Sequence, residues 1–148
     1  MNKKLSMITL TEMGILRIIS RPELNKHLDS IYLNINIINS GTMDLVEKAN
    51  IEIQNSFDKL NLYLETFRII LYKNLARVKE NKAILIKFKI YSEVEKYLWA
   101  QIAIVKDMHN LLEQAVVKMM DNRSQLSNKI SLFKTDATIL IEMLKKVD

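Results

Sequence analysis

The residue types that could carry out chemistry are scarce in this sequence. It contains no cysteine, and its only histidines are His27 and His109. His109 lies one helical turn before Glu113 and close to Asp107, so these three side chains could supply metal ligands from a helical bundle. The Glu-x-x-His pairs of carboxylate-bridged metal sites are missing, however. We therefore expect neither a metal nor a cofactor.

A second candidate pair is Arg21 and His27, six residues apart in the segment RPELNKH. This spacing loosely resembles the Arg-and-His motif of the helical ribonucleases called HEPN domains, in which case the two residues would be the catalytic pair. The resemblance covers seven residues, and Pro22 replaces the polar residue usual after the arginine, so we do not assign the family. A glycine-rich phosphate loop, a nucleophile elbow and a paired-carboxylate motif are all missing from the sequence. We therefore predict that the chain is not an enzyme.

A basic segment offers a different kind of chemistry. RIILYKNLARVKENKAILIKFKIYS, residues 68–92, contains seven Lys or Arg and one acid, Glu80. Basic side chains interleaved with Tyr72, Phe88 and Tyr91 could neutralise phosphates while the rings stack on bases. The competing interpretation is the solvated end of a helix and its connector, where lysines favour the negative end of the helix dipole.

The helical periodicity weakens the first of these interpretations. At about 100° per residue, Lys73 and Arg77 share one side of a helix, whereas Arg68 and Lys79 lie roughly opposite. One flat basic stripe is not predicted, and we favour the solvated surface. Nucleic-acid binding is the alternative function, and its candidate residues are Arg68, Lys73, Arg77, Lys79, Lys82, Lys87 and Lys89.

The composition indicates the fold class and domain organisation that position these residues. The chain has 148 residues with two glycines, one proline and a formal net charge of +5, and 49% of its residues are hydrophobic. This length suits one domain with its own core, and scarce glycine and proline favour long helices over tight turns. The basic start of the chain is followed by an interrupted apolar run without a small-x-small cleavage site, so we expect no signal peptide. No stretch approaches the roughly 18 uncharged apolar residues that span a bilayer. We expect a single cytoplasmic domain over residues 1–148, without a membrane span.

Hydrophobic periodicity places the helices. A short helix is predicted over about 6–19, and a second follows from a capping box at Ser20 and Glu23, with Pro22 in its first turn. Its apolar seam ends near residue 38. Residues 43–80 form the clearest helix, with apolar residues at spacings of three and four over about eight turns. Ser40 or Thr42 is a candidate cap for it.

The second half of the chain is predicted to be helical too. Residues 82–91 fit a helix extension, an extended connector or an edge strand, and a capping box at Ser92 and Glu95 then opens a helix that breaks near 121–124. Together the segments predict an all-α, antiparallel up-down bundle of four to five helices with two long central helices. A short N-terminal helical segment, 6–38, would pack on a long hairpin, 43–147.

The long helix over 43–80 carries a second apolar stripe on another side, formed by Leu62, Ile69, Tyr72 and Ala76. A helix with two apolar sides touches two neighbours, or one neighbour and another molecule. We therefore predict that the chain binds a partner protein through an apolar helix face and forms a homo-oligomer. The candidate exposed anchors are Phe57, Leu64, Ile69, Tyr72 and Trp99.

Overall fold

The computed structural model describes residues 22–41 and 43–147, and this part of the chain is helical without strands. The helices are α3 (Pro22–Asn39), α4 (Met43–Glu80), α5 (Lys82–Lys87), α6 (Tyr91–Lys118) and α7 (Arg123–Lys145). The helix predicted over 6–19, Ser20, Arg21 and Thr42 lie outside the described residues. None of the described helices combines the length and hydropathy required to cross a membrane.

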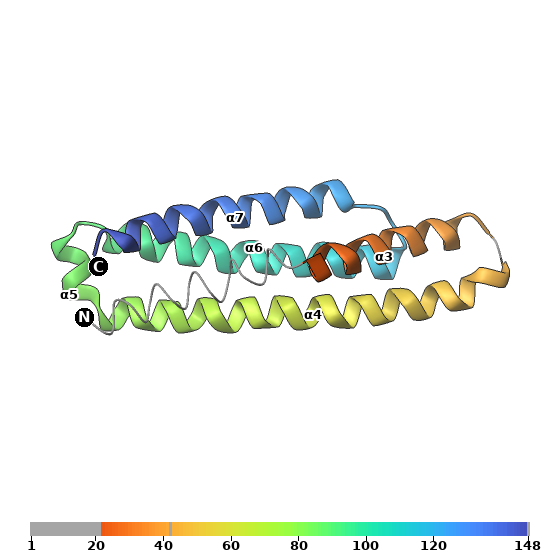
Figure 1. The fold of residues 1–148 in the computed structure, drawn as a ribbon, viewed down its shortest axis with the longest axis horizontal. Coiled ribbons are helices and arrows are strands. Elements are labelled where there is room, and N and C mark those ends of the chain that lie inside the picture. Colours follow the sequence, from red (N-terminus) through yellow and green to blue (C-terminus); the bar gives the residue numbers. More distant parts are fainter. Residues whose placement is uncertain (1–21, 42, 148) are drawn as a thin grey trace.

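The helices form an elongated bundle in which consecutive helices run in opposite directions (Figure 1). α3 packs on α4, α4 on α6, and α6 on α7, while the short α5 contacts α4 and α6. α4 is the longest helix at 38 residues, and α3 has 18. The predicted all-α bundle of antiparallel helices is therefore confirmed.

The core follows the predicted periodicity. The seam of α3 buries Leu24, Leu28, Ile31 and Ile35, and Ile38 is partly buried beside them. The seams of the longer helices are buried in the same way, from Ala49 to Val78 in α4 and from Leu126 to Val147 in and after α7. A helix buries the residues spaced three and four apart, so the alternation in IYLNINI does not produce a strand.

The segment after α4, which the sequence left open, forms α5 and a tight turn. Lys89 adopts a left-handed conformation with φ 60°. The amide of Ile90 donates to the carbonyl oxygen of Leu85 at 3.0 Å, and the amide of Lys89 donates to that of Ile86 at 2.9 Å. These two bonds form a Schellman motif, which ends α5 and lets α6 start at once.

The capping box predicted for α6 is not found, whereas the cap predicted for α4, Ser40 or Thr42, is not tested because Thr42 lies outside the described residues. α6 begins at Tyr91, and no side-chain hydrogen bond caps it, so the capping box at Ser92 and Glu95 was a wrong prediction. Glu95 instead forms a hydrogen bond with the Tyr91 hydroxyl, which raises the pKa of Tyr91. The Ser40 hydroxyl donates to the Ile37 carbonyl oxygen at 2.6 Å, at the end of α3.

The turn between α6 and α7 also joins α3 to the bundle. Asn122 is buried at the start of α7, where its Nδ2 donates to the Leu111 carbonyl oxygen at 2.7 Å. Its Oδ1 accepts a hydrogen bond of 2.6 Å from the Tyr32 hydroxyl of α3. Arg123 forms an ion pair with Asp29 beside this contact. The break predicted near 121–124 is confirmed, and its asparagine links three helices.

Candidate interaction surface

A groove runs between α4 and α6 on the surface of the bundle. From α4 it is lined by Asp58, Asn61, Leu62, Leu64, Glu65, Arg68 and Tyr72, and from α6 by Ile102, Val105, Lys106 and His109. We call this the α4–α6 groove. Leu64 and Val105 are buried, and the other lining residues are exposed or partly exposed. The groove therefore has an apolar floor, and its two walls mix apolar and polar side chains.

An aromatic pair lies at one end of the groove. The Tyr72 and Trp99 rings meet edge to face, with their centroids 6.2 Å apart and an interplanar angle of 87°. Leu62, Ile69, Tyr72 and Trp99 are each between 43% and 61% exposed. Edge-to-face contact is a favoured arrangement of aromatic side chains, so each ring helps to orient the other.

The charges around the groove are balanced. Arg68 donates to Glu65 through Nε at 3.1 Å and through Nη2 at 2.5 Å. This hydrogen-bonded pair lowers the pKa of Glu65 and raises that of Arg68, and nearby His109 lowers the pKa of Glu65 further. Asp58 and Lys106 add one charge of each sign to the lining. An electrically mixed rim of this kind suits a protein surface better than a phosphate backbone.

The predicted anchors are not all exposed. Ile69, Tyr72 and Trp99 are exposed as expected, whereas Leu64 is only 8% exposed and belongs to the core. Phe57 is partly buried against the same core. Both face inward because they follow the buried seam of α4, so neither can be the exposed anchor that we expected.

The seven basic residues differ in exposure and in their contacts. Arg68 is held by Glu65, and the Lys82 ammonium lies 5.2 Å from the centroid of the Tyr91 ring. Arg77 is partly buried. The others, Lys73, Lys79, Lys87 and Lys89, are exposed and form no ion pair within the described part of the chain.

The histidines lie in ordinary polar contacts. His109 Nε2 is 3.8 Å from a Glu113 oxygen, and Asp107 accepts a 3.3 Å hydrogen bond from Lys129. Among residues 22–41 and 43–147, no cluster of three or more His, Asp or Glu has the arrangement of a metal site. His27 is partly buried near Tyr63, and burial, followed by Lys26 and Lys59, lowers its pKa. Arg21, its proposed catalytic partner, lies outside the described residues.

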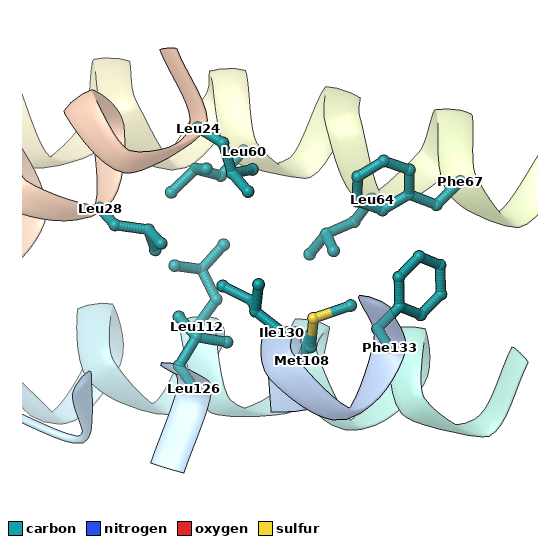
Figure 2. A pocket seen from close by; sticks show the side chains of 10 residues that line it. All are labelled: Leu24, Leu28, Leu60, Leu64, Phe67, Met108, Leu112, Leu126, Ile130 and Phe133. Carbon is teal, nitrogen blue, oxygen red and sulfur yellow. The ribbon is translucent and has the colours of Figure 1, made fainter. Parts of the chain in front are cut away.

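The interior offers little room for a small molecule. Figure 2 shows a cavity where α3, α4, α6 and α7 meet, lined entirely by apolar side chains such as Leu28, Phe67, Met108 and Phe133. Its volume is about 20 Å³. Ligand pockets usually measure about 300–1,000 Å³, and a buried water needs polar partners, so this cavity is a packing defect.

On α6, sequence reasoning predicted only Trp99 as an exposed anchor and missed the groove residues Ile102, Lys106 and His109. Trp99, Ile102, Lys106 and His109 recur at spacings of three and four, which places them on one face of α6. That periodicity is present in the sequence, but the same helix also carries a longer apolar seam, which is buried and gives the stronger signal. Comparisons with protein-family models, with curated proteins and with solved structures found no match to this chain.

Proposed function

We propose that this chain is a non-enzymatic, cytoplasmic helical bundle that binds a partner protein. The observation that carries the proposal is the exposed Tyr72–Trp99 pair at one end of the α4–α6 groove, together with the exposed Leu62 further along its lining. Tyrosine and tryptophan are enriched among the few residues that dominate binding at protein interfaces. Exposing such a cluster to water costs free energy that a docked partner recovers.

The occupant that best fits the groove is an amphipathic helix of the partner. From Asp58 to Tyr72 the groove follows α4 for about 21 Å, the length of about four helical turns. A helix laid between α4 and α6 would place its apolar stripe on Leu64, Val105 and the aromatic pair. Its flanking charges would meet Asp58 on one wall and Lys106 on the other.

Trp99 provides the readout for this proposal because it is the only tryptophan in the chain. The partner is captured with the wild-type protein, identified, and its helical segment is made as a tryptophan-free peptide. Titration of that peptide should shift Trp99 emission to shorter wavelength as the ring leaves water. Tyr72→Ala should weaken binding about thirtyfold, equivalent to about 2 kcal/mol at an interface hot spot.

Leu132→Ala is the matched control, since Leu132 is an equally exposed apolar residue on α7. It should leave the affinity unchanged. Equal affinities of Tyr72→Ala and wild type, or a peptide that binds without changing Trp99 emission, would remove the groove from the proposal.

Self-association is proposed as a second property of the same exposed surface. A chain with apolar residues on the outer side of α4 can bury them against a second copy. Light scattering during size-exclusion chromatography should show a defined oligomer in the wild type, and Ile69→Ser should shift it towards the monomer. A monomer at every protein concentration would contradict self-association without affecting the binding of a different partner.

Nucleic-acid binding is the competing function, and one observation favours it. Lys73, Lys79, Lys87 and Lys89 are exposed and free of ion pairs within the described part of the chain. Contacts with phosphates weaken steeply as salt rises, because binding releases condensed counterions. The ratio of absorbance at 260 and 280 nm in purified protein should then fall between low and high salt, whereas a protein-like ratio at both salts would exclude this function.

A further inference from the structure

The end of the bundle formed by α5 combines exposed apolar side chains with unpaired positive charge. α5 connects α4 to α6 at this end, and α7 finishes at the same end of the bundle (Figure 1). Leu85 is fully buried and attaches α5 to the core. Ile84 and Ile86, on either flank of Leu85, and Phe88, just after α5, are between 37% and 54% exposed. We call Lys79–Lys89 the basic end.

The charge of the basic end is strongly one-sided. It contains Lys79, Lys82, Lys87 and Lys89 against the single acid Glu80. Of these four lysines, only Lys82 has an ion-pair or ring contact with a described side chain, the Tyr91 ring.

The surrounding acids do not neutralise this charge. Glu142 Oε1 lies 3.7 Å from Lys145 Nζ in α7. Glu95 forms a hydrogen bond with the Tyr91 hydroxyl. Glu93 is exposed in the first turn of α6. Lys146, also exposed, adds a positive charge after α7. The lysines of the basic end are therefore available to an anionic partner.

We propose that the basic end docks the protein on an anionic membrane surface. Ile84, Ile86 and Phe88 enter the boundary between headgroups and acyl chains, and the lysines contact lipid phosphates and carboxylates. α5 has only six residues, so the contact is shallow and needs both the apolar side chains and the charge. No part of the described chain crosses the bilayer in this arrangement.

The apolar side chains distinguish a membrane from a nucleic acid at this end. Bases can stack on the exposed Phe88 ring, whereas the branched aliphatic side chains of Ile84 and Ile86 offer no flat face for stacking. Their burial among acyl chains is favourable, and the lysines beside them gain from the negative potential of an anionic leaflet. α5 lies at one extremity of the elongated bundle, where a flat surface can approach along the long axis (Figure 1).

Vesicle flotation with the full chain tests the proposal. Vesicles of phosphatidylcholine alone should bind little protein, and vesicles that also contain phosphatidylserine should bind it in a salt-sensitive manner. Lys87→Glu should lower the partition coefficient roughly twenty-fivefold, since each basic charge near an anionic leaflet contributes about fivefold and the reversal changes two charges. Ile86→Ser with Phe88→Ser should also abolish most binding.

Matched controls lie near the start of α4, at the opposite end of the bundle. Lys48→Glu and Ile51→Ser make the same changes at exposed positions there and should keep wild-type binding. Circular dichroism confirms that each variant is folded. Tyr72→Ala should also bind vesicles normally, which separates this proposal from the α4–α6 groove.

Three results would overturn the proposal. The first is equal binding to both kinds of vesicle. The second is unchanged vesicle binding by the variant Ile86→Ser with Phe88→Ser. The third is tight binding of a labelled single-stranded oligonucleotide that Lys87→Glu weakens while this serine variant retains it, because the basic end would then be a nucleic-acid surface.

Discussion

At the scale of single residues, the hydroxyl of Tyr32 is the best-defined polar contact in the interior. It donates to Asn122 Oδ1 at 2.6 Å, and both residues are buried. Tyr32→Phe leaves that oxygen without its donor, so we expect the free energy of unfolding to fall by about 1–3 kcal/mol. Urea denaturation measures the change. Tyr63→Phe, on a partly buried tyrosine with no recorded hydrogen bond among the described residues, should cost less.

The same hydroxyl makes stability depend on alkaline pH. Burial raises the pKa of Tyr32 to about 12, whereas an unfolded tyrosine ionises near 10.0. Between these values the folded state retains a proton that the unfolded state has lost, so stability falls as pH rises from about 10 to about 12. The decline should be shallower in Tyr32→Phe than in the wild type. Parallel pH profiles for the two proteins would contradict this assignment.

At the scale of elements, α6 carries a polar residue in its buried face. Gln101 is fully buried, and neither its side-chain oxygen nor its nitrogen has a hydrogen-bond partner within the described part of the chain. Replacing a buried, unsatisfied polar group by an apolar one of similar size removes its desolvation cost. Gln101→Leu should therefore raise the free energy of unfolding by about 1–3 kcal/mol in urea denaturation.

The control for this change is Gln114→Leu, on the exposed side of the same helix. It should change stability by less than about 0.5 kcal/mol. A loss of stability in Gln101→Leu would show that the Gln101 amide forms a favourable hydrogen bond, for example with a buried water.

The end of α5 uses a lysine where glycine is usual. Lys89 has φ 60° in a Schellman motif, a conformation that costs a non-glycine residue about 1–2 kcal/mol. Its side chain is exposed, so little packing is lost by removing it. Lys89→Gly should raise the thermal midpoint of unfolding. Ala83→Gly, at an exposed position inside α5, should lower it because glycine costs about 1 kcal/mol relative to alanine in a helix interior.

At the scale of the whole molecule, two phenylalanines join helices that are distant in sequence. Phe67 of α4 and Phe133 of α7 are both fully buried, with ring centroids 5.5 Å apart. A double-mutant cycle with Phe67→Leu and Phe133→Leu should give a coupling energy of about 0.5–1.5 kcal/mol. The measurement is the free energy of unfolding of the wild type, both single variants and the double variant.

A distant pair serves as the reference for this cycle. Phe133 lies 11 residues from Asn122, the partner of Tyr32, or about 16 Å along α7. Phe133→Leu and Tyr32→Phe should therefore be additive within about 0.5 kcal/mol. Equal coupling in the two cycles would indicate that the bundle responds to any core change as a unit, without a specific contribution from the ring pair.

Most of the fold was predictable because helices repeat their contacts every three and four residues. The apolar series from Ala49 to Val78 defined α4 to its last residue, Glu80. The break between α6 and α7 followed from the polar residues near Asp121. The conformation of residues 82–91 was not predictable, because a Schellman turn centred on a lysine has no glycine to mark it.

The candidate site was only partly predictable from the sequence. Tyr72, Ile69 and Trp99 were predicted to be exposed, and they are. Leu64 was wrongly predicted to be exposed, because the sequence of a helix with two apolar stripes does not show which stripe faces the core. The meeting of Tyr72 with Trp99 required knowledge of how α4 and α6 align, since these residues are 27 positions apart and no local pattern encodes their alignment.

The sequence by itself determined the helical class, the buried seams and most helix boundaries, because these depend on short-range spacing and on the scarcity of glycine and proline. Only the tertiary structure decided which side of α4 lines a groove and that Arg68 forms an ion pair with Glu65. It also decided that Ile84, Ile86 and Phe88 gather with lysines at one end of the bundle. Those outcomes depend on contacts between helices, where the geometry of packing selects among faces that the sequence leaves equivalent.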